Sequence, residues 1–184
     1  MKDALAIHRM LLERETLHEI VRLPNPITSA DDLPKAGLPA GHCLATRVYA
    51  VTTRTSLTTR GHRLAAVIVL AGTTVGIEPV RLALGARALR PAGADQINSV
   101  TDFAAALVSP LLLPDSMTVL VDRRVIDRLR DDDVVYTATG EPWTALGIRA
   151  ADLYAVSGAR PVDLAPAATT AVPGPRRGHK SIRR

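Results

Sequence analysis

The sequence is poor in the residues that cross-link small folds or bind metals through thiolates. Cys43 is the single cysteine among 184 residues, which excludes an internal disulfide and a zinc site built on several cysteines. Aromatic residues make up only 3% of the chain and hydrophobic residues 47%, so the core must consist mainly of Leu, Val, Ile and Ala. We expect Cys43 to be a small buried residue and not a nucleophile paired with His42, because neighbours on a strand point to opposite faces.

Long hydrophobic runs are also lacking. The longest, Leu64–Gly72, is much shorter than the roughly 20 residues of a membrane-spanning helix, and the charged N-terminal segment does not resemble a secretion signal. Motifs for phosphate loops, serine hydrolases and zinc peptidases do not occur. The run Asp131–Asp133 is interpreted as a solvated loop in preference to a metal site. We therefore expect a cytoplasmic protein that uses no metal and no cofactor.

Acidic residues are missing from the end of the chain, after Asp163. Five of the 23 basic residues fall in the last nine positions, and the other 18 balance the 18 acidic residues, so the net charge of +5 belongs to the tail. Residues 165–184 have no apolar periodicity and are predicted to be disordered. Such a tail is either a basic arm that adds salt-sensitive affinity for RNA phosphates or a solvated segment without a role. Its basic residues are Arg176, Arg177, Lys180, Arg183 and Arg184.

Hydrophobic periodicity divides residues 1–164 into helices and strands. Asp3–Glu15 has apolar residues at helical spacing, and prolines end a short strand at His18–Leu23. Ser29 has the character of an N-cap for a short helix that ends near Gly37. The other predicted strands are Leu44–Thr52, Leu64–Ala71, Ala88–Arg90, Met117–Val121 and Val134–Thr137, and the other predicted helices are Gly76–Leu84, Asp95–Ala105, Arg123–Leu129 and Arg149–Val156.

Some of these strands follow one another without an intervening helix. The polar segment Thr53–Arg63, which contains Gly61, predicts a hairpin loop between two of them. Strands joined through hairpins favour a mixed α/β sheet over a doubly wound parallel sheet. We predict a single α/β domain over residues 1–164.

A series of short motifs along this domain has a characteristic order and spacing. The motifs are Ala36–Pro39 (AGLP), Ala45–Val48 (ATRV), Leu64–Leu70, Leu82–Ala86 (LALGA), Thr101–Pro110 (TDFAAALVSP), Val119–Asp122 (VLVD), Thr139–Gly140 and Asp152–Leu153. Together they resemble the YbaK/EbsC (ProX-like) family of aminoacyl-tRNA deacylases, a domain that is also inserted in bacterial prolyl-tRNA synthetases.

The resemblance implies a compact α/β domain around a mixed, strongly bent sheet flanked by helices. It also implies hydrolysis of the ester of misacylated tRNA, such as Cys or Ala on the tRNA for proline, with an aminoacyl-tRNA synthetase as a further partner. The family uses neither a metal nor a protein nucleophile. A strand lysine holds the end of the substrate, and a Gly-x-x-x-Pro loop places backbone groups against the carbonyl, which suits a reaction that depends on positioning and oxyanion stabilisation.

The chain departs from this pattern at the residues expected to do the chemistry. Ala45 stands at the lysine position, and Ala106 and Leu107 stand at the two glycine positions of the loop. Arg47 lies on the same face of the predicted strand as Ala45 and Tyr49, roughly 6.5–7 Å further along. Its guanidinium either replaces the missing cation or extends outward as an ordinary surface side chain.

The remaining candidate site residues follow from the resemblance alone. Ala106, Ser109 and Pro110 belong to the loop, and Ala45, Thr46, Thr101, Asp122 and Gly140 are assigned to substrate binding. Each polar member also has a structural interpretation, since Thr101 would cap an element, Ser109 would begin a turn and Asp122 would end a strand. Three functions remain open: a deacylase with a remodelled site, a degenerate member that binds tRNA ends or a small ligand without hydrolysis, or a structural or protein-interaction module unrelated to RNA.

Overall fold

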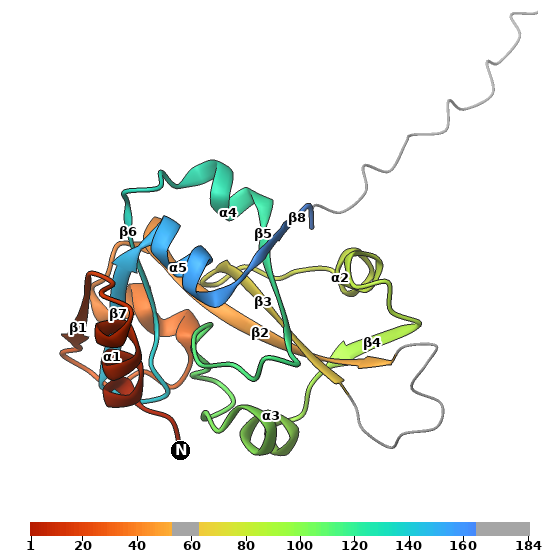
Figure 1. Cartoon of the computed structure of the whole chain (residues 1–184), viewed down its shortest axis with the longest axis horizontal. Helices are drawn as coiled ribbons and strands as arrows, with labels where there is room; N and C mark the ends of the chain where they lie inside the picture. Colours follow the sequence, from red (N-terminus) through yellow and green to blue (C-terminus); the bar gives the residue numbers. More distant parts are fainter. Residues whose placement is uncertain (53–62, 165–184) are drawn as a thin grey trace, which may run out of the picture.

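The protein is described by a computed structural model that covers residues 1–52 and 63–164 (Figure 1). The predicted hairpin loop, except for Arg63, and the basic tail lie outside these residues. The helical elements are α1 (Ala4–Glu13), η1 (Ala30–Ala36), η2 (Ala40–His42), α2 (Ile77–Ala83), α3 (Ala94–Thr101), α4 (Arg123–Arg128) and α5 (Ala150–Ser157). The strands are β1 (His18–Arg22), β2 (Cys43–Thr52), β3 (Arg63–Leu70), β4 (Ala88–Pro91), β5 (Thr118–Asp122), β6 (Val134–Ala138), β7 (Thr144–Arg149) and β8 (Arg160–Val162).

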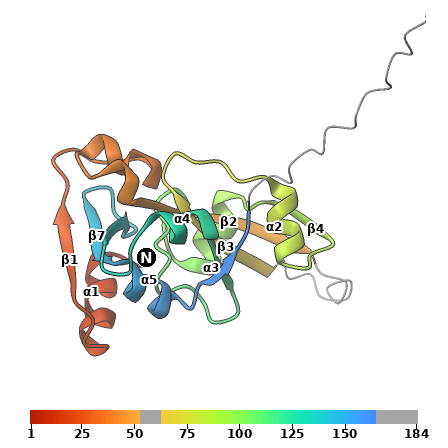
Figure 2. The same cartoon turned by 90° about the horizontal axis from the view of Figure 1, so that it is seen from above.

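The strands of the described residues form one mixed sheet. Seven of them have the order β1-β7-β6-β2-β3-β5-β8, and β4 pairs with the far end of β2. Pairing is antiparallel in β1–β7, β6–β7, β2–β3 and β2–β4, and parallel in β2–β6, β3–β5 and β5–β8. The two views show β1 and β7 steeply inclined to β2 and β3, so the sheet is strongly bent (Figures 1 and 2). This confirms the predicted fold class.

Strand β2 separates two hydrophobic clusters because its successive side chains point to opposite faces. Leu44 and Val48 pack into a cluster with residues of α1, α3, α4 and α5. Ala45 and Tyr49 pack into the other cluster, with residues of η1 and α2. Both layers are built mostly from aliphatic side chains, as the scarcity of aromatic residues predicts.

Several elements differ from those predicted. The segment after Ser29 is a 3-10 helix, although Ser29 caps it as expected and it ends at Gly37. Helix α3 ends at Thr101, short of the predicted Ala105, because Asp102 adopts the left-handed conformation (φ 61°). Strands β7 and β8 were not predicted. In the described residues, no helix is long and apolar enough to cross a membrane.

Candidate functional site

Arg47 and Ala45 lie on the face of β2 that is covered by η1. The packing of Ala45 and Tyr49 against η1, together with the contact of Arg47 with that element, confirms that the three residues share this face. Ala45 is only 1% exposed, so its methyl group is enclosed by the apolar cluster. The side chain of Arg47 is partly buried, with 30% of its surface exposed.

The guanidinium of Arg47 is fixed by two elements. Its Nη2 donates hydrogen bonds to Oδ1 of Asp31 at 2.7 Å and to the carbonyl oxygen of Thr73 at 3.2 Å. Among the described residues, Nη1 and Nε of Arg47 make no hydrogen bond. Because a guanidinium carries five N–H donors, Arg47 retains donors for an anion while it is held in place.

Asp31, in the first turn of η1, organises this arrangement. The same Oδ1 accepts a hydrogen bond from the backbone N–H of Gly72 at 2.7 Å. Burial alone would raise the pKa of Asp31, but the hydrogen bonds from Arg47 and Gly72 outweigh it and lower the pKa below its usual value. The carboxylate is therefore ionised at neutral pH and joins β2, η1 and the turn after β3.

The segment from Ala106 to Pro110 passes between the two clusters. Ala106 is exposed, and its carbonyl oxygen accepts a hydrogen bond from Ala30 N–H at 3.0 Å. Leu107 packs into the same cluster as Ala45, whereas Val108 packs on the opposite face of the sheet. Two adjacent residues of η1 thus contact these segments, Ala30 the loop and Asp31 the side chain of Arg47.

Two predicted site residues, Thr101 and Ser109, form hydrogen bonds within the protein. The hydroxyl of Thr101 donates to the carbonyl of Ile97 (2.8 Å) and accepts from Phe103 N–H (3.2 Å), which caps the end of α3. Ser109, fully buried, accepts from Leu111 N–H at 3.3 Å in a turn.

Two further predicted site residues, Thr46 and Gly140, lie in closely packed surroundings. Thr46 is buried on the opposite face of β2, and its hydroxyl has no hydrogen-bond partner among the described residues. Gly140 has φ +95°, and a Cβ there would lie 2.5 Å from the carbonyl oxygen of Lys2 and 2.8 Å from Phe103. Close approach of the N-terminal segment accounts for glycine at this position.

A cavity of about 210 Å³ lies next to the Arg47 site. Asp122 contributes to it at the end of β5, where its carboxylate accepts hydrogen bonds from the backbone and guanidinium of Arg124. Thr73 connects this cavity with the Arg47 side chain, because its carbonyl accepts a hydrogen bond from Arg47 and the residue also lines the cavity. The full lining is Leu70, Thr73, Asp122, Arg124, Val125 and Arg128. Arg124 is paired with Asp122 and Arg47 with Asp31, so among the described residues Arg128 is the unpaired cation of the cavity lining.

The chain matches the aminoacyl-tRNA editing domain over residues 33–156. It belongs to this family. The matched region begins within η1 and ends within α5, so it includes β2 with Ala45 and Arg47, the Ala106–Pro110 loop and the 210 Å³ cavity. A search of curated proteins finds no significant match.

Solved structures share the fold of this editing domain. Hypothetical protein APE2540 superposes with a TM-score of 0.70 at 18% identity, over 86% of this chain and 97% of the other. A candidate trans-editing enzyme for prolyl tRNA synthetase superposes with a TM-score of 0.68 at 20% identity, over 86% and 93%. A candidate signal transduction protein from Marinobacter aquaeolei VT8 has a TM-score of 0.56 at 18% identity, and the match covers 86% of this chain but 30% of that one.

Two features of the Arg47 region were not predicted from the sequence. Asp31 is recognisable in the sequence only as an acidic residue in a first helical turn, and its pairing with Arg47 depends on a contact across 16 positions. Thr73 contributes through its backbone carbonyl, which no side-chain pattern reveals. The predicted burial of Cys43 is confirmed, since it is 0% exposed and burial raises the pKa of its thiol to about 11.

Proposed function

We propose that this editing-domain protein hydrolyses the ester bond of misacylated tRNA, acting in trans in the cytoplasm on tRNA charged by a synthetase. Family membership supports the reaction class. The observation that carries the proposal is the contact of Asp31 with Arg47 and of the neighbouring Ala30 with Ala106. These bonds connect a fixed cation and the loop to neighbouring residues of η1, which supports a shared site although the family lysine is absent.

In this proposal water attacks the carbonyl carbon of the aminoacyl ester. The tetrahedral intermediate then collapses, and the bond between the carbonyl carbon and the ribose oxygen breaks. The ribose oxygen takes up one proton of the attacking water, the other proton is released to the solvent, and the amino acid leaves as a carboxylate. The backbone of the Ala106–Pro110 loop shapes the carbonyl site, and Arg47 stabilises negative charge with its free Nη1 and Nε donors.

The terminal nucleotide of the tRNA would extend from this site toward the 210 Å³ cavity. Arg124 and Arg128 line that cavity and carry charge suited to a phosphate. The basic residues of the 165–184 segment add contacts with RNA that depend on salt. A prolyl-tRNA synthetase is the expected partner, because a deacylase of this kind acts on tRNA that the synthetase releases.

A second candidate function is a binding protein without hydrolysis. It is favoured by Ala45, which places an enclosed methyl group where the family has a lysine, and by Leu107, which packs into the same cluster. In this alternative Arg47 binds the tRNA end or a small anion, and the ester stays intact.

A deacylation time course distinguishes the two functions. Purified full-length protein is mixed with Ala- and Cys-charged tRNA for proline, and with correctly charged Pro-tRNA as a control. The deacylase proposal predicts faster loss of Ala or Cys than in buffer, with little loss of Pro. Binding of the same tRNAs without faster hydrolysis, together with gain of hydrolysis in Ala45→Lys, would establish the second function.

A further inference from the structure

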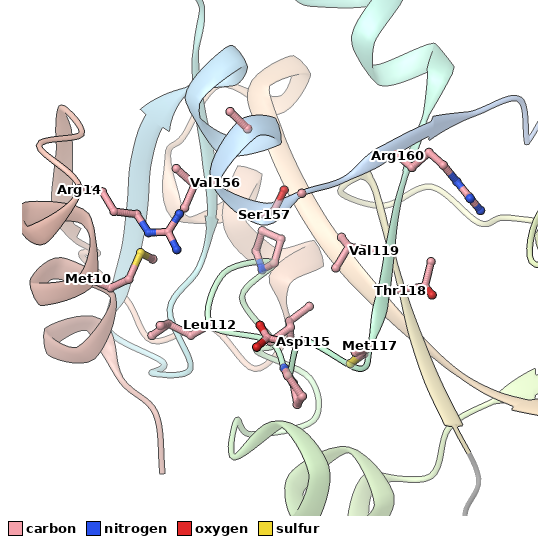
Figure 3. Close-up of a pocket in the computed structure, with 15 residues that line it drawn as sticks. Met10, Arg14, Leu112, Asp115, Met117, Thr118, Val119, Val156, Ser157 and Arg160 are labelled. Atoms are coloured by element: carbon pink, nitrogen blue, oxygen red, sulfur yellow. The ribbon is translucent and has the colours of Figure 1, made fainter.

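A second cavity has a volume of about 670 Å³ (Figure 3). Its apolar lining belongs to the hydrophobic cluster of Leu44 and Val48, on the face of β2 opposite to Ala45. It is an open cavity bordered by the end of α1, the segment that follows Pro110, the start of β5 and the end of α5, and Arg14 and Asp115 are both exposed at it. Its volume falls in the range typical of small-molecule sites. Apolar side chains form much of its wall: Met10, Leu112, Leu113, Met117, Val119 and Val156.

Three charged residues line this cavity: Arg14, Asp115 and Arg160. The guanidinium of Arg160 donates a hydrogen bond to the carbonyl of Ala83 at 3.3 Å, whereas Arg14 and Asp115 are not paired with each other. Arg14 reaches toward the cavity from the α1 side, and the carboxylate of Asp115 lies near Leu112 and Met117 (Figure 3). Within residues 1–52 and 63–164, neither side chain forms an ion pair or a hydrogen bond. A ligand with one anionic and one cationic group would satisfy both.

The backbone adds to this polarity at the α5 side. Helix α5 ends at Ser157, and residues 155–158 line the cavity. The C-terminal end of a helix carries partial negative charge and favours a cation. The hydroxyl of Ser157 donates to the carbonyl of Tyr154, so its oxygen can accept a hydrogen bond from a ligand ammonium group. Arg14, the C-cap of α1, provides the positive side.

These features discriminate among classes of ligand. A simple anion would meet Asp115 and the negative end of α5, and a simple cation would meet Arg14. An uncharged apolar molecule would leave both charges unpaired. We infer that the cavity binds a free α-amino acid with an apolar side chain: its carboxylate pairs with Arg14, its ammonium group with Asp115 and the end of α5, and its side chain packs against the apolar wall.

The inference does not rest on the proposed function, since the ligand is a free amino acid and no tRNA is involved. The two are chemically connected, because ester hydrolysis releases a free amino acid. Pro110 lines the cavity and also ends the Ala106–Pro110 loop. A bound amino acid would therefore contact the segment that leads into the loop.

Isothermal titration calorimetry of the full chain with L-leucine tests the inference. The comparison ligands are 4-methylpentanoic acid, which lacks the ammonium group, and 3-methylbutylamine, which lacks the carboxylate. Each should bind at least about tenfold more weakly than L-leucine, as expected for loss of one hydrogen bond between charged groups. Backbone amide shifts in an NMR titration should concentrate at Leu112, Asp115 and Gly158.

Two variants test separately whether Arg14 binds the carboxylate and Asp115 the ammonium group of the ligand. Arg14→Gln should weaken L-leucine and the acid but leave the amine unchanged, and Asp115→Asn should weaken L-leucine and the amine but leave the acid unchanged. Arg9→Gln and Asp127→Asn are matched controls on exposed helix surfaces. No binding at millimolar L-leucine, equal binding of all three ligands, or affinity unchanged in both variants would overturn the inference. Because tRNA is absent, none of these results bears on deacylation.

Discussion

Nη2 of Arg47 lies 2.7 Å from Oδ1 of Asp31, and the same oxygen accepts the backbone N–H of Gly72 at 2.7 Å. One carboxylate oxygen therefore fixes the guanidinium and the turn after β3 together. Arg47 is neither a free surface side chain nor a fully neutralised one, since the donors on Nη1 and Nε make no bond among the described residues. This relationship makes the orientation of Arg47 depend on Asp31.

The substitution Asp31→Asn tests whether Asp31 serves mainly to orient the Arg47 guanidinium or mainly to stabilise the folded protein. The pair is about one-third exposed, so it contributes only about 0.5–1 kcal/mol to the free energy of unfolding. Misplacement of a catalytic group has a much larger effect on the reaction rate. We therefore expect Asp31→Asn to lower kcat/KM for deacylation by roughly tenfold to a hundredfold. Steady-state kinetics and urea unfolding are measured on the same samples, with Asp127→Asn as control. A loss of activity fully explained by unfolded protein would contradict this expectation.

A fall in pH should lower the free energy of unfolding through the two carboxylates of η1. Hydrogen bonds from Lys35 and Thr28 lower the pKa of Asp32 from 3.8 to about 2, and the pKa of Asp31 is also lowered. A carboxyl group with a lowered pKa in the folded protein stabilises it above the unfolded pKa, and this contribution disappears as the pH falls toward the folded pKa.

The free energy of unfolding should therefore decline between pH 4 and pH 2 more steeply in the wild type than in Asp32→Asn. Urea unfolding followed by circular dichroism across this range provides the comparison. Asp127→Asn serves as control because its exposed side chain makes no hydrogen bond in the described part of the chain. Parallel curves for the wild type and Asp32→Asn would show that Asp32 does not contribute.

Gly140 and Gly158 form a matched pair for a test of the close approach by the N-terminal segment. Both have positive φ, but a Cβ at Gly158 meets nothing within 4 Å, whereas at Gly140 it meets Lys2 and Phe103. Gly158→Ala should lower the free energy of unfolding by about 1–2 kcal/mol through backbone strain alone. Gly140→Ala should lower it by roughly 2–5 kcal/mol, since overpacking adds to the strain. Equal losses in thermal or urea unfolding would argue against the contact with Lys2.

Deletion of residues 165–184 tests the role of the basic tail. If its five basic residues contact RNA phosphates, affinity for tRNA falls on deletion, and the slope of log Kd against log salt becomes shallower. Filter binding of uncharged tRNA at several salt concentrations measures both quantities. Equal affinity and equal salt dependence with and without the tail would assign RNA binding to residues 1–164 alone.

Local sequence patterns account for much of the fold. The alternation in β2 correctly predicts that Ala45, Arg47 and Tyr49 share a face, and the Ser29 cap fixes the start of η1. Strand β7 was missed because it is buried on both faces and Gly147 interrupts its β-branched and aliphatic run. Strand β8 has only three residues and contains Pro161, which local propensity does not favour in a strand.

The site itself is less visible in the sequence. The resemblance points to a loop and to a vacant lysine position, and the capping interpretation of Thr101 agrees with its hydrogen bonds at the end of α3. The bonds from η1 to Arg47 and to the loop join segments far apart in the chain, and one of them involves backbone groups alone. Such contacts depend on tertiary packing, which no local pattern records.

Single-turnover deacylation of Ala-tRNA for proline by the wild type and Arg47→Ala tests the central claim most directly. Exposed Arg9→Ala is the control, and Ala45→Lys is measured alongside. We predict accelerated hydrolysis by the wild type and by Arg9→Ala, and a loss on the order of 10²–10³ in Arg47→Ala, comparable to removal of one oxyanion donor. Equal rates for the wild type and Arg47→Ala, or hydrolysis that occurs only in Ala45→Lys, would contradict the claim that Arg47 replaces the missing lysine.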